Sequence, residues 1–266
     1  MSDLKFIDTH AHIHFDNYKL DADEVWQDAK KAGVTKMLAV GCDIDSSRRA
    51  IEFAKDRQGV YAVIGVHPHD ASNFLATDNP EEQLENLLTN LDSDKIVAIG
   101  EFGLDYFYEN SDKNDQKILL EMQLRLCQKY NLPACFHVRE AFDDFWPIFE
   151  RYNELQSIRG VLHSFTDTDE NMKKGVAYGL YIALNGIITF SRKVEQLAMA
   201  KNVPSSHLLL ETDAPYLTPK QFRGKICKPE YVLLTAEFLA NLRGENLSQI
   251  SEITTKNAEK LFKLED

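Results

Sequence analysis

Short apolar runs alternate with segments of helical periodicity along the whole 266-residue chain. Eight apolar, β-branched runs are candidate strands, at residues 4–7, 36–40, 60–66, 96–99, 133–136, 160–162, 180–184 and 207–210. Candidate helices lie at residues 21–32, 46–56, 80–91, 116–130, 142–152, 169–178, 194–201 and 230–242. Open doubly wound sheets usually have fewer strands than this. We therefore expect an α/β fold, a single-domain (β/α)8 TIM barrel with its active site at the carboxyl ends of the strands.

Turn and capping residues agree with this alternation. Asn79 and Pro80 are typical of a helix start, while Gly33 and Gly179 stand where helices should end. The sequence contains no flexible linker, no low-complexity tract and no residue-level repeat, so residues 1–266 are expected to form one domain. Neither GxGxxG nor GxxxxGK[ST] is present, which removes the main sequence support for dinucleotide and P-loop chemistry.

Charge and cysteine content limit which binding partners and which cellular environment we expect for this chain. The net charge of −12 and the pI near 5.2 oppose non-specific coating of nucleic acid or membranes, although one chain end could still be bound locally. No stretch of 18 apolar residues is present. The four cysteines form no CxxC pair and follow no signal peptide. We expect a cytoplasmic monomer without membrane contact or a disulfide-linked partner.

Polar residues gather where the predicted strands end. They are His10 and His12 after the first run, His67 and His69 after the third, Glu101 after the fourth, His137 after the fifth, His163 after the sixth, and Asp213 after the eighth. A single strand-end histidine is more often structural, and a single carboxylate often caps a helix. In a barrel, however, these groups would meet at one rim, so their combination predicts an active site.

This set of side chains is typical of a metal centre. Imidazole and carboxylate together suit Zn²⁺, Mn²⁺ or Fe²⁺, although availability can also select Mg²⁺. The six candidate ligands are His10, His12, Glu101, His137, His163 and Asp213. Six ligands exceed what one tetrahedral zinc needs, so we expect two divalent ions about 3.5–4 Å apart. Two dications and two carboxylates leave a positive site, which favours an anionic substrate.

Basic residues near the same strand ends fit such a substrate. The segment 220–228 contains four basic residues, among them Arg223 and Lys225, and no acidic one. Arg139 lies two residues beyond His137, hence on the same strand face, and has the fork geometry that binds phosphate. The alternatives are a solvated loop and, for Arg139, a salt bridge with a neighbouring carboxylate. Aromatic residues at 106–108 and at 190 are candidates for base stacking or for packing.

Seven motifs together resemble the TatD-type metal-dependent deoxyribonucleases of the amidohydrolase-like barrels, in order and over essentially the whole chain. They are DTHAH at 8–12, GVHP at 65–68, GEFGLD at 100–105, HVREA at 137–141, HSF at 163–165, ETDAPY at 211–216 and TKNA at 255–258. The segment 223–229 departs from the family pattern, because Cys227 and Lys228 replace an amide and an acid or amide. This departure puts contacts to the nucleotide in question, not the metal ligands.

The resemblance implies a role for each candidate residue. His10, His12, Glu101 and Asp213 would hold one metal ion, and Glu101 would bridge to a second ion completed by His137 and His163. His67 and Arg139 would face the substrate. Separately from the resemblance, we expect Asp213 to orient the attacking water and accept its proton, and Arg223 and Lys225 of the basic segment to add phosphate contacts.

The hypothesis is metal-assisted hydrolysis of phosphodiester bonds in DNA. Because the acidic net charge favours local binding to a chain end or a single strand, 3'-5' or other end-directed exonuclease action is expected. An amidohydrolase or esterase acting on an amide, lactone or aminoacyl ester is the alternative within the same fold. A metal-binding scaffold without turnover is a third possibility, which the six intact ligand positions disfavour.

Overall fold

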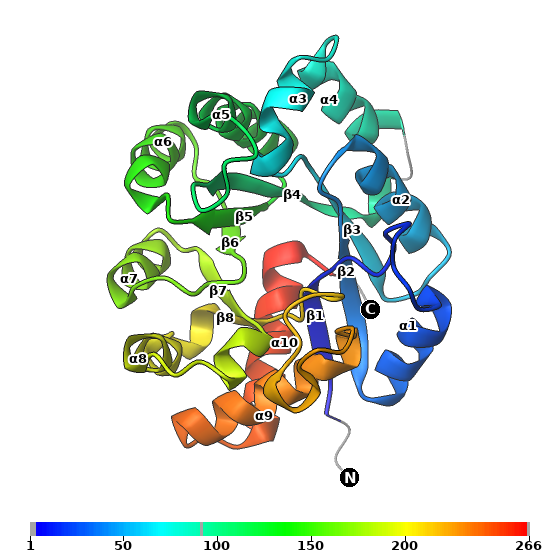
Figure 1. Ribbon diagram of the computed structural model, residues 1–266, viewed down its shortest axis with the longest axis vertical. Helices are drawn as coiled ribbons and strands as arrows, with labels where there is room; N and C mark the ends of the chain where they lie inside the picture. Colours follow the sequence, from blue (N-terminus) through cyan, green and yellow to red (C-terminus); the bar gives the residue numbers. More distant parts are fainter. Residues whose placement is uncertain (1–3, 91–92, 265–266) are drawn as a thin grey trace. The chain divides into compact units, whose positions relative to one another are not determined.

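The computed structural model describes residues 4–90 and 93–264 (Figure 1). Eight parallel strands form one sheet whose order follows the chain from β1 to β8. The strands are β1 (Phe6–Ala11), β2 (Val34–Val40), β3 (Val60–Ile64), β4 (Ile96–Asp105), β5 (Ala134–Arg139), β6 (Gly160–Leu162), β7 (Tyr181–Leu184) and β8 (Leu208–Leu210). An isolated parallel bridge between Ala11 and Ala214 joins the end of β1 to the segment after β8. The predicted (β/α)8 barrel is confirmed.

Helices connect successive strands, as the barrel requires. The α-helices are α1 (Ala22–Lys31), α2 (Ile44–Lys55), α3 (Ala71–Leu75), α4 (Pro80–Asn90), α5 (Lys113–Tyr130), α6 (Phe142–Leu155), α7 (Asp169–Ala177), α8 (Val194–Asn202), α9 (Val232–Arg243) and α10 (Leu247–Phe262). Short 3-10 helices are η1 (Pro68–Asp70), η2 (Ser93–Lys95), η3 (Gly186–Thr189), η4 (Ser205–His207), η5 (Lys220–Phe222) and η6 (Pro229–Tyr231). Within residues 4–90 and 93–264, no helix combines the length and the apolar character needed to cross a membrane.

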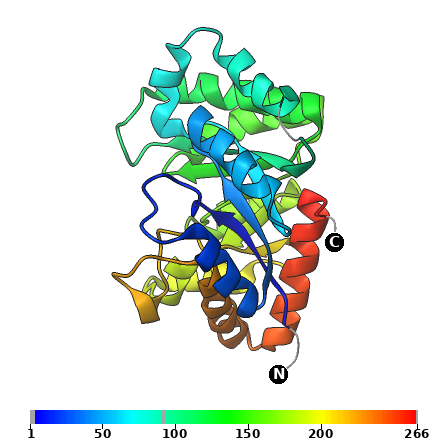
Figure 2. The ribbon, with the colours of Figure 1, turned by 90° about the vertical axis from the view of Figure 1, so that its right-hand side faces the viewer.

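The described residues divide into two compact units. The terminal unit comprises residues 4–39, 58–60 and 164–264. In this unit α10 packs against β1 and β8, as Figures 1 and 2 show for the red helix beside the dark blue strand. Helix α10 lies beyond the last predicted helix, which ended at residue 242. Its buried residues Ile250, Thr254 and Leu261 nevertheless follow a helical spacing.

The central unit comprises residues 40–57 and 61–163. Its core lies where α5 covers β4 and where β4 pairs with β5. Four fully buried aromatic side chains fill that core: Phe102, Phe136, Phe145 and Phe149. The Phe102 and Phe136 ring centroids are 5.1 Å apart, and those of Phe136 and Phe145 are 5.2 Å apart, both edge to face. This close packing gives the strand ends of the unit a rigid base.

Local sequence explains where the helices begin and end. Asp21 and Thr168 cap α1 and α7 through their side-chain oxygens, which accept backbone N–H groups three residues later. The positive φ values of Gly33 (97°) and Gly179 (80°) confirm that glycine follows α1 and α7. The first residue of α4 is Pro80, as predicted; the last residue of its predicted range, 91, lies outside the described residues.

Two strands extend further than their apolar runs. β1 continues to Ala11 and β4 to Asp105, whereas the sequence predicted ends at residues 7 and 99. Both strands remain fully buried through their polar residues. His10 and Glu101 therefore lie inside strands, near the carboxyl ends, rather than in the loops that follow.

Candidate metal centre

Three histidines of the central unit converge on one carboxylate, and we call Glu101, His67, His137 and His163 the Glu101 cluster. Glu101 Oε1 lies 2.8 Å from His137 Nδ1, 2.8 Å from His163 Nε2 and 3.6 Å from His67 Nε2. The Glu101 side chain is only 6% exposed. A buried carboxylate with three imidazoles around it is well suited to hold a divalent cation.

A β-bulge positions Glu101. The pairing of β4 with β5 shifts between Gly100 and Phe102, which leaves Glu101 as the extra residue. Two residues later Gly103 pairs with His137, and a Cβ atom at Gly103 would overlap the His137 carbonyl oxygen. Only glycine permits this close approach. The GEFG sequence thus aims the carboxylate and brings β4 close to its histidine partner.

His137 is held between two carboxylates. Its Nδ1 contacts Glu101, and its Nε2 lies 2.8 Å from Asp105 Oδ2, which is also 3.1 Å from His69 Nε2. Burial lowers the pKa of His137, but the hydrogen bonds with Asp105 and Glu101 raise it overall. Burial raises the pKa of Asp105, yet its hydrogen bonds with His137 and His69 bring it below its ordinary value. Asp105 therefore orients His137 as an ionised partner.

His67 presents one ring nitrogen to the same cluster. Its Nδ1 accepts the backbone N–H of His69 at 3.1 Å, so Nε2 is the atom that faces Glu101. Burial, reinforced by the nearby His137, lowers the pKa of His67 well below its ordinary value. The ring is therefore neutral, and because Nδ1 accepts a hydrogen bond, Nε2 carries the ring proton and points it toward Glu101.

The terminal unit contains a second group, His10, His12 and Asp213, which we call the Asp213 cluster. The Nε2 atoms of His10 and His12 are 3.2 Å apart. Asp213 Oδ1 lies 3.2 Å from His12 Nε2 and 3.8 Å from His10 Nε2. The three potential ligand atoms thus face one another, as predicted from the alternation of His10 and His12 along a strand.

Backbone hydrogen bonds hold the Asp213 cluster together. The Asp213 N–H donates to the His10 carbonyl at 2.8 Å, and the His12 N–H donates to the Ala214 carbonyl at 2.6 Å. These bonds continue the parallel bridge at the end of β1. Main-chain pairing therefore contributes to the spacing of the two histidines and the carboxylate.

Asp8 supports that arrangement from inside the terminal unit. Its carboxylate accepts the Thr212 hydroxyl at 2.5 Å, the Thr212 N–H at 2.9 Å and the His10 N–H at 3.3 Å. Burial raises the pKa of Asp8 to about 8, against the smaller lowering effect of the Thr212 hydrogen bonds. Asp8 thus links the end of β1 to the segment after β8 by hydrogen bonds.

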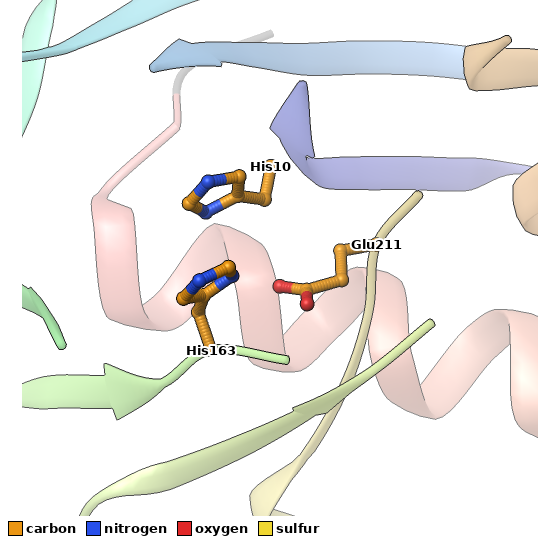
Figure 3. Close-up of side chains that lie close together, drawn as sticks. All are labelled: His10, His163 and Glu211. Carbon is orange, nitrogen blue, oxygen red and sulfur yellow. The ribbon is translucent and has the colours of Figure 1, made fainter. Parts of the chain in front are cut away.

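Glu211 is a further buried carboxylate of the terminal unit. Its Oε1 accepts the Ser164 N–H at 2.7 Å and the Asn185 side-chain amide at 3.2 Å. Figure 3 shows Glu211 on the chain after β8 and His10 at the end of β1; the third side chain drawn, His163, immediately precedes Ser164. Glu211 therefore ties the segment that carries His163 to the segment that carries Asp213.

Both clusters fit a divalent metal ion by the chemistry of their donors. Each combines imidazole nitrogens with a carboxylate oxygen, the set preferred by Zn²⁺, Mn²⁺ and Fe²⁺. The Nε2 atoms of His10 and His12 face each other, so a shared cation would satisfy both lone pairs. His67, Glu101 and His137 offer ligand atoms that all lie within 4.8 Å of one another.

Three of the predicted substrate residues, Arg139, Arg223 and Lys225, are cations that lie against aromatic rings. The Arg139 guanidinium lies 3.7 Å from the centre of the Phe107 ring, and that of Arg223 lies 4.5 Å from the centre of the Phe190 ring. Lys225 Nζ is 5.5 Å from the Phe222 ring centre. Within residues 4–90 and 93–264, neither arginine forms a salt bridge with a carboxylate. The salt bridge considered as an alternative for Arg139 is thus not formed within that part of the chain.

Comparison with known proteins places this arrangement in a family. The model of the family described as TatD related DNase matches residues 7–263. The chain belongs to the TatD family. It is 36% identical to the Bacillus subtilis metal-dependent hydrolase YabD over 97% of this chain and 98% of that protein. It is 34% identical to the 3'-5' ssDNA/RNA exonuclease TatD of Cronobacter sakazakii, over 91% and 92% of the two chains.

A solved structure agrees with the sequence relatives. The Escherichia coli TatD homologue YjjV superposes with a TM-score of 0.91 at 31% identity, over 99% of this chain and 100% of that one. The family resemblance inferred from the motifs is confirmed, and the chain is a TatD-family metal-dependent hydrolase acting on ester bonds. The identity and number of its metal ions stay predictions.

Sequence reasoning did not assign roles to four residues that the structure places in or beside the clusters: Asp8, His69, Asp105 and Glu211. Asp105 and Asp8 lie within motifs that were recognised, but a carboxylate inside a strand carries no signal of its own. His69 was noted only for its position after the third strand. Glu211 directly precedes Thr212 and Asp213, so its place at a strand end was the available signal.

Proposed function

We propose that this TatD-family hydrolase is an end-directed exodeoxyribonuclease, with 3'-5' polarity, acting on single-stranded DNA with two divalent metal ions. The Glu101 cluster carries the proposal, because one buried carboxylate oxygen faces three imidazole nitrogens. Such a carboxylate suits the role of a bridging ligand between two ions. The name of the Cronobacter relative, a 3'-5' ssDNA/RNA exonuclease, supports the substrate class and polarity.

Each predicted ligand has a place in this proposal. His10, His12 and Asp213 would hold one ion together with Glu101, and Glu101 would share the second ion with His137 and His163. Zn²⁺, Mn²⁺ and Mg²⁺ are the candidate ions. When bound, they would supply an activated water and neutralise phosphate charge.

Acid–base and binding roles fall to the protein side chains. Asp213 would orient the attacking water and accept its proton, because its carboxylate is 14% exposed whereas Glu101 is buried. Neutral His67 would donate a hydrogen bond from Nε2 to a substrate oxygen. Arg139, Arg223 and Lys225 would bind non-bridging or flanking phosphate oxygens.

The remaining expectations follow from charge and composition. With a net charge of −12, the protein should bind a strand end rather than coat a duplex. We further propose that residues 1–266 act as one domain, as a cytoplasmic monomer. Of the two departures from the family pattern, Cys227 is buried beside the segment that carries Asp213, with its Sγ 3.9 Å from the Thr212 carbonyl oxygen. Lys228 is the departure that would affect nucleotide contacts.

The test combines metal restoration with a charge-removing variant. Metal-stripped protein is restored separately with Mg²⁺, Mn²⁺ and Zn²⁺ and incubated with end-labelled single- and double-stranded oligonucleotides, an ester and an amide. Stepwise shortening of the single strand is expected, with a loss of about 10³-fold or more in the Glu101→Gln variant. Glu52→Gln, an exposed substitution on α2, is the matched control.

Three outcomes would contradict parts of the proposal. Normal turnover by fully metal-loaded Glu101→Gln would remove Glu101 from the reaction. Inert oligonucleotides beside a hydrolysed ester or amide would favour the amidohydrolase alternative. Cleavage of closed circular DNA as fast as linear DNA would exclude end-directed action.

A further inference from the structure

Two large aromatic side chains are exposed directly after β4. Phe107 is 47% and Tyr108 is 45% exposed, although aromatic residues usually bury most of their surface. Their ring centroids are 4.7 Å apart and nearly perpendicular. The Arg139 guanidinium lies 3.7 Å from the Phe107 ring centre and 5.0 Å from that of Tyr108. We call Phe107, Tyr108 and Arg139 the aromatic platform.

The structure holds this platform in one position. Asp105 pairs with Arg139 across β4 and β5, and the Tyr106 N–H donates to the Arg139 carbonyl at 3.0 Å. Asp105 Oδ1 accepts the backbone N–H groups of Phe107 and Tyr108 at 3.0 and 3.1 Å. The loop is therefore preorganised, and the rings are exposed although their backbone is fixed.

Asp105 also connects the platform to the Glu101 cluster. Its Oδ2 binds His137 while its Oδ1 binds the aromatic loop, so one carboxylate sets both positions. Gln116 fixes Asp105 in turn, accepting its N–H at 2.8 Å and donating to its carbonyl at 3.1 Å. In addition, the Tyr108 ring lies 5.2 Å from that of His69. A ligand on the platform would thus lie in a constant position relative to His137.

The chemistry of the platform matches an unpaired nucleotide. Exposed aromatic faces stack nucleobases of any sequence, and an adjacent arginine binds phosphate. Within the described residues, no carboxylate neutralises Arg139. A base inside a duplex is stacked on both faces and is not available to such a surface.

We propose that the aromatic platform is a subsite for an unpaired nucleotide of the substrate strand, with its base stacked on one of the two perpendicular rings, Phe107 or Tyr108, and in contact with the edge of the other, and its phosphate on Arg139. This inference rests on the proposed nuclease function and adds a structural reason for preferring single strands. The platform selects the strand end, whereas the Glu101 cluster belongs to the reaction itself.

The test compares single strands that differ only in their three terminal bases. Two end-labelled oligonucleotides are used, one complete and one with abasic tetrahydrofuran nucleotides in its three terminal positions. The ratio of kcat/KM for the complete strand over the abasic strand is expected to fall about tenfold in a Phe107→Leu, Tyr108→Leu double variant. Ile118→Ala, which removes an exposed apolar side chain from α5, should leave this ratio unchanged.

Binding of the same labelled strands to metal-stripped protein, followed by fluorescence anisotropy, separates this inference from the proposed function. If the complete strand binds more tightly than the abasic strand and the double variant removes the difference, the subsite stands even when nothing is hydrolysed. Equal loss on both strands, or no change in the ratio, would overturn it. Arg139→Gln should weaken both strands, since both retain their phosphates.

Discussion

The two clusters of this TatD-family protein hold similar side chains by different means. In the Asp213 cluster, backbone hydrogen bonds from Asp213 and His12 contribute to the spacing of the ligand atoms. In the Glu101 cluster, side chains hold one another, because Glu101 contacts three imidazoles and Asp105 contacts His137 from the other side. Substitutions in the Asp213 cluster should therefore lower activity without lowering stability, whereas substitutions in and beside the Glu101 cluster should lower both.

The largest expected effect is a loss of activity without a loss of stability when Asp213 of the Asp213 cluster is changed. Asp213→Asn should lower kcat on single-stranded DNA about 10³-fold, because the proton acceptor and a charged ligand are lost. The melting temperature should change little, since the backbone bonds that position residue 213 remain. Turnover assays and thermal melts of the same preparation check both expectations. A large loss of stability would show that the carboxylate itself holds the cluster.

Asp105→Asn should lower both activity and stability. Losing one charged hydrogen-bond partner of His137 is expected to cost about 10–100-fold in activity or metal affinity. Because the carboxyl is buried, stability should fall by about 2 kcal/mol, a shift of several degrees in melting temperature. Asp143→Asn, exposed in the first turn of α6, is the control. If Asp105→Asn lost activity at full stability, side-chain support of the Glu101 cluster would be wrong.

The folded-state pKa is raised at Asp8, beside the Asp213 cluster, and lowered at Asp105, beside the Glu101 cluster, so the two carboxyl groups should change stability with pH in opposite directions. Asp8 has a folded pKa of about 8, above its ordinary value of 3.8, so its contribution is lost as the pH rises between these values. The stability of metal-free Asp8→Asn relative to wild type should therefore increase from pH 4 to 8.

Asp105 has a lowered folded pKa, so its contribution is complete above the unfolded value near 4 and shrinks as the pH falls further. The deficit of metal-free Asp105→Asn should accordingly grow from pH 3 to 5, and it should shrink again as the pH rises through the raised pKa of its partner His137. Thermal melts across this range check both variants, and parallel profiles for the two would refute the assignment.

The smallest effect concerns the basic segment of the terminal unit. The Arg223 side chain is exposed and lies over the Phe190 ring. Arg223→Gln should raise KM for single-stranded DNA about threefold, as expected for an exposed charge. A larger effect than that of Arg139→Gln would make the basic segment, not the aromatic platform, the main contact to the strand.

The same contrast explains which parts of the site were predictable. His10 and His12 follow from a simple alternation along β1, and Asp213 from its position after an apolar run. Glu101 was found as a strand-end carboxylate, but its true setting is a bulge inside β4. A bulge reverses the alternation of side chains, and nothing in the apolar pattern announces it.

Supporting residues were harder to predict for a physical reason. The role of Asp105 depends on hydrogen bonds with His137, His69 and the loop after it, all of which require β4 and β5 to be in register. The exposure of Phe107 and Tyr108 is likewise a tertiary property. Periodicity predicts which faces are buried, but it does not predict which exposed rings share a fixed loop.

Chain connectivity makes the two clusters differ during synthesis. All residues of the central unit have been synthesised once residue 163 is added. His10 and His12 can pair with Asp213 only after about 200 further residues have been added to the chain. At about 5–20 residues per second, a ribosome needs about 10–40 s to cover that distance. We expect the Glu101 cluster to mature first, so that protease resistance of arrested nascent chains appears in residues 61–163 before it appears near β1. Equal protection of both regions at every arrest point would contradict this order.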